Sequence, residues 1–207
     1  YYCLSFGAII LILFLINFDM SKKIFIGVSL IFGFILFLIL FQGMVTPLYA
    51  EDFLLPSFGT GKIHVRLYTD YFCGPCSSLE PKVESVILDL VEKKTITIIF
   101  IDIPIHKQTV HYAKYFLYIL NENKDFKNAL YARSLLFEAA KNKIVNEEKL
   151  ELFLRERKVK FRPFYVLPTF ALLNNYIKED KVNATPTCVI FNGEKKRFEG
   201  TGDIIKA

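Results

Sequence analysis

The sequence predicts an α/β domain that follows an apolar N-terminal region, and three observations predict it. The first fifty residues hold most of the apolar excess of a chain that is 53% hydrophobic, with a mean hydropathy of +0.33. Residues 63–101 alternate between strand-like and helix-like patterns. Near the C-terminus, an Asn-Gly pair separates two further strand-like stretches.

The charges of the chain exclude one class of function. The net charge is only +5, and basic residues are interspersed with acidic ones rather than clustered. Without a basic patch there is no electrostatic basis for binding nucleic acid. We therefore expect no nucleic-acid partner.

Two apolar segments near the N-terminus are long enough to be membrane spans. Leu4–Phe18 is apolar except for one serine and one asparagine, and Ile24–Phe41 is an 18-residue apolar run that contains a single serine. A transmembrane helix needs about 20 residues. The link between the segments is so short that two helices there must form a hairpin. Its two lysines place the turn on the cytoplasmic side. Residues 1–50 are thus predicted to form two transmembrane helices, and residues 51–207 to lie outside the cytoplasm.

A signal peptide is the alternative interpretation of the second segment. Residues 20–50 begin with Met-Ser-Lys-Lys, continue with the apolar run and end in Pro-Leu-Tyr-Ala, which would allow cleavage after Ala50. The apolar run is longer than a usual signal core, and residues 1–19 form a second credible span. Either interpretation exports the rest of the chain, to the periplasm or the cell surface.

The exported part begins with a predicted linker, residues 51–62, ahead of a domain at 63–207. Ile63–Thr69 is rich in β-branched and aromatic residues and predicts a strand. Apolar residues spaced three and four apart predict a helix over Cys76–Lys93. The continuous apolar run Thr95–Ile101 predicts a strand buried on both faces, joined to the first by a right-handed crossover.

A helical block over about 109–180 separates this unit from the terminal hairpin. Within the block, Asn146 predicts an N-cap before a helix with one apolar face. Thr187–Phe191 and Lys196–Glu199 bracket the Asn-Gly turn of the hairpin, and a last helix is expected to follow.

Two cysteines, Cys73 and Cys76, lie in a CGPC segment where the first strand ends and the first helix begins. Free main-chain N–H groups and the helix dipole favour an anion there, and hence the reactive thiolate of Cys73. Cys76 is near enough to resolve a mixed disulfide formed at Cys73, and Gly74-Pro75 keeps the turn tight. A zinc site would need about four ligands, and a structural disulfide in so small a loop would constrain little chain. The segment therefore predicts a redox pair and no metal.

A second element of the predicted site is Thr185-Pro186, just before the third strand. The residue before a proline favours extended backbone. A cis bond would present the backbone of Thr185 to a bound peptide beside the two sulfurs, whereas an ordinary trans proline in a loop is the alternative. We predict that Thr185 and Pro186 bind substrate.

Residues 63–207 resemble the DsbA-like branch of the thioredoxin superfamily. The segments that show the resemblance are DYFCGPCSSLEP, IDIPIHKQTVHYAKY, the helical block and NATPTCVIFNGEKKRFEGTGD. The resemblance implies a thioredoxin-like fold with a helical insertion before the cis-proline strand. It also implies that Cys73 is the attacking thiol, Cys76 the resolving thiol and Pro186 the cis-proline. Two features depart from the pattern: the dipeptide is Gly-Pro, as in thioredoxins, and Leu67 stands where an acidic residue often lies. The group that exchanges a proton with Cys76 is therefore left unassigned.

The first fifty residues are similar to the tail of fused bacterial vitamin K epoxide reductase homologues. The similarity lies in YYCLS, an apolar helix, a basic turn, a second apolar helix, a linker and a thioredoxin-like domain in that order. It implies that Cys3 belongs to a membrane redox pair beside a quinone, and that the hairpin ends a larger membrane bundle. A buried apolar cysteine is the alternative. No cofactor is expected in the exported domain itself.

Other polar residues are interpreted as structural. Cys188 lies in a buried strand and is expected to pack in the core. His106 and His111 flank the start of the helical block and are expected to pack against it or cap it. Asp70 is interpreted as a turn residue.

The sequence therefore predicts a membrane-tethered thiol–disulfide oxidoreductase that acts on cysteine-containing exported proteins. The direction is open, because Gly-Pro favours reduction or isomerisation whereas a quinone-coupled membrane part favours oxidation; we favour oxidation. A tethered module that binds proteins without catalysis, through the groove around Pro186 and the insertion, is the alternative. Replacement of Cys73 by serine distinguishes the two.

Overall fold

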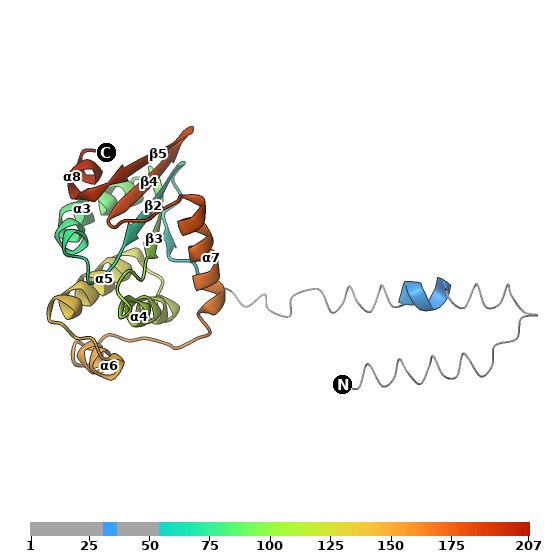
Figure 1. Cartoon of the computed structure of the whole chain (residues 1–207), viewed down its shortest axis with the longest axis horizontal. Helices are drawn as coiled ribbons and strands as arrows, with labels where there is room; N and C mark the ends of the chain where they lie inside the picture. Colours follow the sequence, from blue (N-terminus) through green and yellow to red (C-terminus); the bar gives the residue numbers. More distant parts are fainter. Residues whose placement is uncertain (1–30, 37–53) are drawn as a thin grey trace, which may run out of the picture. The chain divides into compact units, whose positions relative to one another are not determined.

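The structure, a computed structural model, describes residues 31–36 and 54–207 (Figure 1). The chain divides into two units, Tyr1–Asp52 and Phe53–Ala207. Residues 31–36 are helical. Among the described residues, no helix is both long and apolar enough to span a bilayer. Apart from 31–36, the predicted transmembrane helices lie outside the described residues, as does Cys3.

The predicted parallel strand–helix–strand unit is present. Strand β2 (Ile63–Thr69) pairs in parallel with β3 (Ile96–Asp102) along its whole length, and α3 (Gly74–Glu92) connects them. Parallel strands end at the same edge of a sheet, so the carboxyl ends of β2 and β3 lie side by side. This edge positions the candidate site.

The hairpin and the helical insertion also follow the prediction. Strands β4 (Thr187–Asn192) and β5 (Glu194–Glu199) are antiparallel, and Gly193 between them has a φ of 75°, as the turn requires. The remaining helices are α4 (Thr109–Glu122), α5 (Phe126–Lys141), α6 (Glu147–Glu156), α7 (Leu167–Glu179) and α8 (Gly200–Lys206). Asn146 caps α6 as predicted, because its side-chain oxygen accepts hydrogen bonds from two backbone N–H groups at 2.8 and 3.2 Å.

One prediction about the linker is wrong. Ser57–Phe58, inside the segment 51–62, forms strand β1, which pairs antiparallel with β3 and completes the order β1-β3-β2-β4-β5. Phe58 is buried, with its ring centroid 5.1 Å from that of Phe126 on α5. Burial of a large aromatic side chain and the open edge of β3 explain why this short segment joins the sheet.

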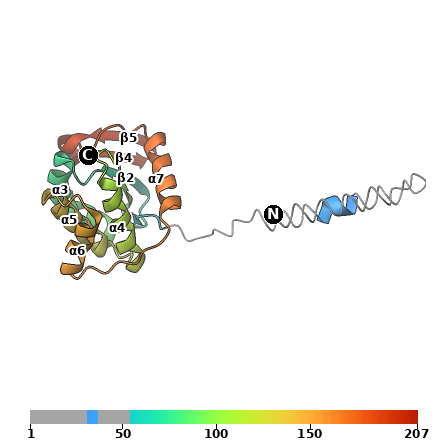
Figure 2. The same cartoon turned by 60° about the horizontal axis from the view of Figure 1, so that its bottom comes forward.

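The sheet buries a different set of side chains on each face. Leu67 and Phe100 pack into a large core together with α3, α4 and α5. Their neighbours Tyr68 and Ile101 point to the other face and pack with Leu173 of α7. This alternation follows from the period-two geometry of strands. Figure 2 shows α7 on the far side of the domain from α3.

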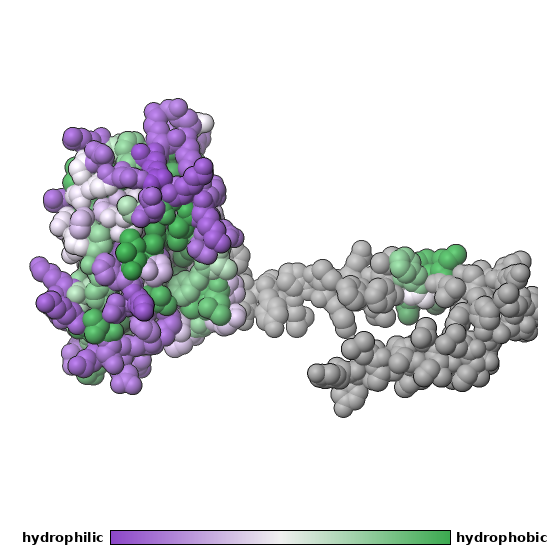
Figure 3. Space-filling model, viewed as in Figure 1, coloured by the Kyte–Doolittle hydropathy of each residue, from purple (hydrophilic) through white to green (hydrophobic). Residues whose placement is uncertain are grey.

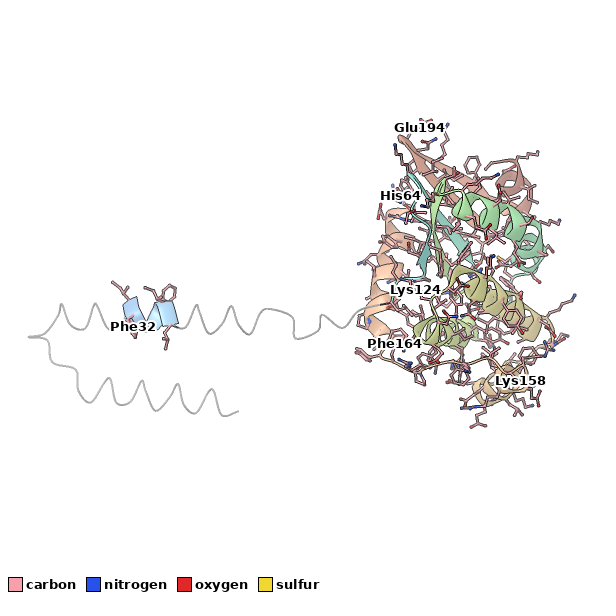
Figure 4. All side chains as sticks on the ribbon, turned by 180° about the vertical axis from the view of Figure 1, so that it is seen from behind. Phe32, His64, Lys124, Lys158, Phe164 and Glu194 are labelled. Carbon is pink, nitrogen blue, oxygen red and sulfur yellow. The ribbon has the colours of Figure 1, made fainter. Side chains whose placement is uncertain are left out.

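The domain extends from the hairpin to the insertion. Seen from behind in Figure 4, Glu194 at the hairpin turn and Lys158, which follows α6, mark its opposite ends. The carboxyl ends of β2 and β3 lie between them, against the insertion, where Thr69 and Asp102 contact Arg133 of α5.

Candidate active site

A tight turn at Asp70 delivers Cys73 to the start of α3. The Asp70 side chain is fully buried, and one of its carboxylate oxygens accepts a hydrogen bond from the backbone N–H of Phe72 at 2.8 Å. The Asp70 carbonyl accepts from the N–H of Cys73 at 3.1 Å. Cys73 then has extended backbone angles (φ −81°, ψ 118°) and forms the N-cap of the helix.

The sulfur of Cys73 lies between the helix terminus and the loop that precedes β4. Cys73 Sγ accepts a hydrogen bond from the N–H of Cys76 at 3.4 Å and donates one to the carbonyl oxygen of Thr185 at 3.4 Å. The Thr185–Pro186 bond is cis, as the sequence predicts. The structure therefore brings together four of the predicted site residues, and Cys73 remains half-buried and reachable from solvent.

Cys76 differs sharply from Cys73 in its surroundings. Its side chain is fully buried, and this burial, with a smaller effect of the hydrogen bond to Cys73, raises the pKa of the Cys76 thiol to about 12. The backbone of Asp70 opposes that shift only in part. At neutral pH, Cys76 is consequently a protonated thiol that large reagents cannot reach.

The third described cysteine is a packing residue, as predicted. Cys188 is buried on β4, directly opposite Leu67 of β2, and burial raises its pKa to about 12. Leu67 stands where an acidic residue often lies in the family that the sequence resembles, so its neighbour across the sheet is the Cys188 thiol and no carboxylate is supplied at this position of β2.

A fully buried arginine, which no local sequence pattern had singled out, links the insertion to the site. Arg133 of α5 donates from Nε and Nη2 to the two carboxylate oxygens of Glu80 on α3, at 2.6 and 3.1 Å. It also donates to Asp102 at the end of β3 (3.3 Å) and to Thr69 at the end of β2 (2.9 Å). One side chain of the insertion thus holds the ends of both central strands and the helix of the cysteine pair.

Opposing charges keep this buried cation ionised. Burial lowers the pKa of Arg133, but the carboxylates of Glu80 and Asp102 outweigh it and leave that pKa raised. Burial raises the pKa of Asp102, and Arg133 opposes this shift. A hydrogen bond from the Tyr71 hydroxyl to Asp102 (3.0 Å) completes the network.

The positions of Glu80 and Arg133 in their helices could have revealed them as a buried pair from the sequence. Glu80 lies four residues after Cys76, so a charged residue shares the buried face of α3. Arg133 lies within the stripe of buried α5 residues that includes Ala129 and Leu136. A charge on an apolar stripe indicates a buried partner.

Asp70 and His106 form a second polar contact beside the cysteines. The backbone N–H of His106 donates to Asp70 at 2.9 Å, and His106 Nδ1 lies 3.0 Å from the other carboxylate oxygen. Since a carboxylate only accepts, Nδ1 carries the proton in this contact. The His106 ring is about half exposed and its centroid lies 6.1 Å from the ring of Phe72. Asp70 is therefore a turn residue, as predicted, and also the anchor of His106.

Aromatic side chains fix the segment that precedes Cys73 to the insertion. The ring of Tyr71 packs 4.9 Å from Phe137 and 5.4 Å from Tyr112, and Phe72 packs edge-on against Tyr112 at 5.0 Å. The insertion is thus part of the support of the site.

No metal site is built from the described residues. Across 31–36 and 54–207, no three His, Cys, Asp or Glu side chains gather in a way that could hold an ion. The predicted membrane cysteine, Cys3, and any quinone site beside it fall outside these residues.

Comparisons with known proteins agree on the fold. No protein-family model matches the sequence, and no curated relative matches it. Among solved structures, Proteus mirabilis ScsC in a transitional conformation matches with a TM-score of 0.58 and 15% identity, over 91% of this chain and 95% of that one. A periplasmic thioredoxin-like protein from Salmonella enterica serovar Typhimurium matches with a TM-score of 0.55 and 19% identity, over 71% and 82%. Pseudomonas aeruginosa DsbA2 matches with a TM-score of 0.53 and 15% identity, over 73% and 91%.

These likenesses establish the architecture of the described domain. It is a mixed α/β domain with a DsbA-like, thioredoxin-type fold and a helical insertion before the cis-proline strand. At such low identities the likeness concerns the fold, and the chemistry must be argued from the site itself.

Proposed function

We propose that the protein is an extracytoplasmic thiol–disulfide oxidoreductase that acts on cysteine-containing exported proteins. The observation that supports this most directly is the position of the Cys73 sulfur. It lies between the N–H of Cys76 at a helix N-terminus and the carbonyl of Thr185 at a cis peptide bond. A reachable sulfur, a buried partner thiol one turn away and an adjacent backbone carbonyl are the parts that disulfide exchange needs.

In the oxidising direction, the protein starts with a Cys73–Cys76 disulfide. A substrate thiolate attacks Cys73, the sulfur that is reachable; the bond to Cys76 breaks, and a mixed disulfide forms. A second substrate thiolate then attacks the substrate sulfur of the mixed disulfide and releases Cys73. The substrate loses an electron pair and gains a disulfide, while the protein ends as the dithiol.

Departure of Cys76 in the first step needs a proton. Because burial raises the pKa of this thiol to about 12, its thiolate is a poor leaving group unless protonation accompanies bond breaking. In the reverse direction the same property requires that Cys76 lose its proton as it resolves a mixed disulfide.

The segment before β4 supports a role in substrate binding. The Thr185 backbone lies beside Cys73, so a substrate strand that pairs with this backbone would place its own sulfur next to the reactive one. We propose that Thr185 and Pro186 align the substrate in this way.

Trapping of the mixed disulfide tests the proposal. With Cys76→Ser, Cys73 is expected to retain its partner, because no second thiol in the protein can resolve the bond. A one-cysteine peptide, supplied as its mixed disulfide with 2-nitro-5-thiobenzoate, is attacked by Cys73 and releases the aromatic thiol, so a covalent peptide adduct should accumulate on non-reducing gels. Cys73→Ser should form none, and Cys188→Ala should behave like the unchanged protein. Equal adduct formation by Cys73→Ser and Cys76→Ser would contradict the assigned roles, and full biological activity of Cys73→Ser would favour a non-catalytic binding module.

The direction of electron flow has its own test. We propose oxidation, and titration of the pair against glutathione with alkylation of free thiols measures its potential. A very negative potential, with the pair reduced in cells, would instead indicate a reductase. Reoxidation through Cys3 and a quinone stays a prediction, because these groups lie outside the described residues.

A further inference from the structure

A cavity of about 360 Å³ lies between α4, α7 and β3, apart from the cysteine pair. Figure 3 shows hydrophobic side chains gathered on this face, between α4 and α7. Neither Cys73 nor Cys76 lines the cavity. Its walls are mostly apolar and include Phe100, Phe116, Leu117, Phe170, Leu173 and Ile177. The volume falls within the range of small-molecule sites, about 300–1,000 Å³.

One polar group in this apolar lining has no partner. Thr109, at the start of α4, is fully buried and lines the cavity. Its hydroxyl makes no hydrogen bond within the part of the chain that the structure describes. Buried hydroxyls are almost always paired, so an unpaired one beside a cavity indicates a missing hydrogen-bond partner.

The cavity offers no free charge to a ligand. The only ionisable side chain in its lining, among the described residues, is Asp102. Both Asp102 oxygens already accept hydrogen bonds, one from Thr69 and Arg133 and the other from Tyr71. A cation would find this carboxylate neutralised, and an anion would find no basic group in the lining.

We propose that this cavity binds a small neutral molecule, largely apolar and about the size of a substituted aromatic ring, whose single oxygen pairs with the Thr109 hydroxyl. Val110 of α4 and Leu167 of α7 line the cavity and are both partly exposed, which gives the ligand a route in from solvent. The proposal does not depend on the redox chemistry of Cys73 and Cys76.

A pair of matched probes tests the role of the hydroxyl. The full chain in lipid nanodiscs is titrated with 4-methylphenol and with 1,4-dimethylbenzene, which has a methyl group in place of the hydroxyl. Methyl NMR signals of Leu117 and Ile177 report binding. We expect saturable shifts with 4-methylphenol, and about tenfold weaker binding in Thr109→Val, as loss of one hydrogen bond requires. Binding of 1,4-dimethylbenzene should not weaken in that variant.

Control variants separate the site from general effects on folding. Thr109→Ser keeps the hydroxyl and should retain tight binding of 4-methylphenol. Ala171→Leu narrows the cavity from α7 and should weaken both probes, whereas Asn175→Leu, on the same helix but outside the lining, should change neither. Unchanged signals from the β4 residues in each variant establish that the domain remains folded.

Three results would overturn the proposal. One is the absence of saturable shifts in the unchanged chain. Another is an equal effect of Thr109→Val on both probes, since the hydroxyl would then not select an oxygen. The third is an NMR contact between the methyl groups of Leu117 or Ile177 and protons of a polypeptide segment that is not part of α4, α7 or β3. Such a contact would mean that a peptide segment, and not a small molecule, occupies the cavity.

Discussion

Cys73 and Cys76 carry the same functional group in opposite environments. Cys73 is half-buried and hydrogen-bonded at a helix terminus, whereas Cys76 is fully buried and its thiol pKa is raised to about 12. The sequence could predict both positions, because CGPC at a strand–helix junction and a proline before a strand are local signals. It could not predict the contact of Asp70 with His106, which joins residues from different loops.

Buried thiols make the domain sensitive to alkali. The pKa values of Cys76 and Cys188 rise to about 12 on folding from an ordinary value of 9.0. Between pH 9 and pH 12 the unfolded thiols lose protons that the folded ones keep, so the folded state binds more protons and stability falls as pH rises. Each thiol contributes up to about 1.4 kcal/mol per pH unit in this window.

Cys188→Ala is therefore expected to flatten the decline of stability above pH 9. Urea unfolding at pH 7, 9.5 and 10.5 under reducing conditions measures it, with the unchanged protein as reference. Parallel declines in both proteins would show that Cys188 does not titrate as its burial requires.

At the scale of elements, the side chain of Arg133 joins helix α5 to β2, β3 and α3 by hydrogen bonds. The helices and strands that were predicted individually were recognisable because each has its own local pattern of apolar, cap or turn residues. Strand β1 was not recognised, since two residues show no periodicity and their pairing depends on the edge of β3. Arg133 and Glu80 were not paired either, because 53 residues separate them in the chain.

Arg133→Leu is expected to destabilise the domain by about 3–5 kcal/mol at pH 7, because it leaves buried carboxylates without their cation. The pKa of Asp102 should rise further without Arg133, so the folded variant takes up a proton more readily and the loss should be smaller at pH 5 than at pH 7. Chemical denaturation at both pH values measures the effect.

Arg155→Leu is the matched control for this change. Arg155 pairs with Glu151 on the exposed surface of α6, so its loss should change the free energy of unfolding little. Equal effects of the two substitutions would mean that the Arg133 network contributes no more than a surface ion pair.

Just before β2, the backbone at Gly61 lies very close to the backbone at the start of β3. A β-carbon on Gly61 would lie 2.1–2.2 Å from backbone atoms of Thr95 and Ile96, which cannot move aside as a side chain could. Gly61→Ala is therefore expected to cost about 1–3 kcal/mol in thermal or chemical unfolding. Gly202→Ala, in α8 with open space around it, should stay within about 0.5 kcal/mol of the unchanged protein. A neutral Gly61→Ala would show that β2 and β3 can separate at this end without loss.

At the scale of the whole molecule, the order of the main elements between residues 63 and 207 was predictable from the sequence, while attachment to the membrane stays a prediction. Two apolar segments within residues 1–50 predict that the chain resists extraction from membranes by alkaline carbonate. A variant that lacks residues 1–50 and carries an unrelated cleavable export signal should appear in the soluble fraction.

Protease added outside intact cells or spheroplasts should digest the domain of the full chain. Release by carbonate would contradict the prediction of transmembrane helices, and a released product that begins after Ala50 would favour cleavage there.

The Arg133 network also limits how this architecture can be recombined. The guanidinium comes from the insertion, and the carboxylates that it neutralises come from α3 and β3. A chimaera with a foreign insertion that lacks an arginine at this position would bury Glu80 and Asp102 without a cation to neutralise them. An exchange of insertions between such proteins, in the laboratory or in evolution, must therefore change the residues at positions 80, 102 and 133 together.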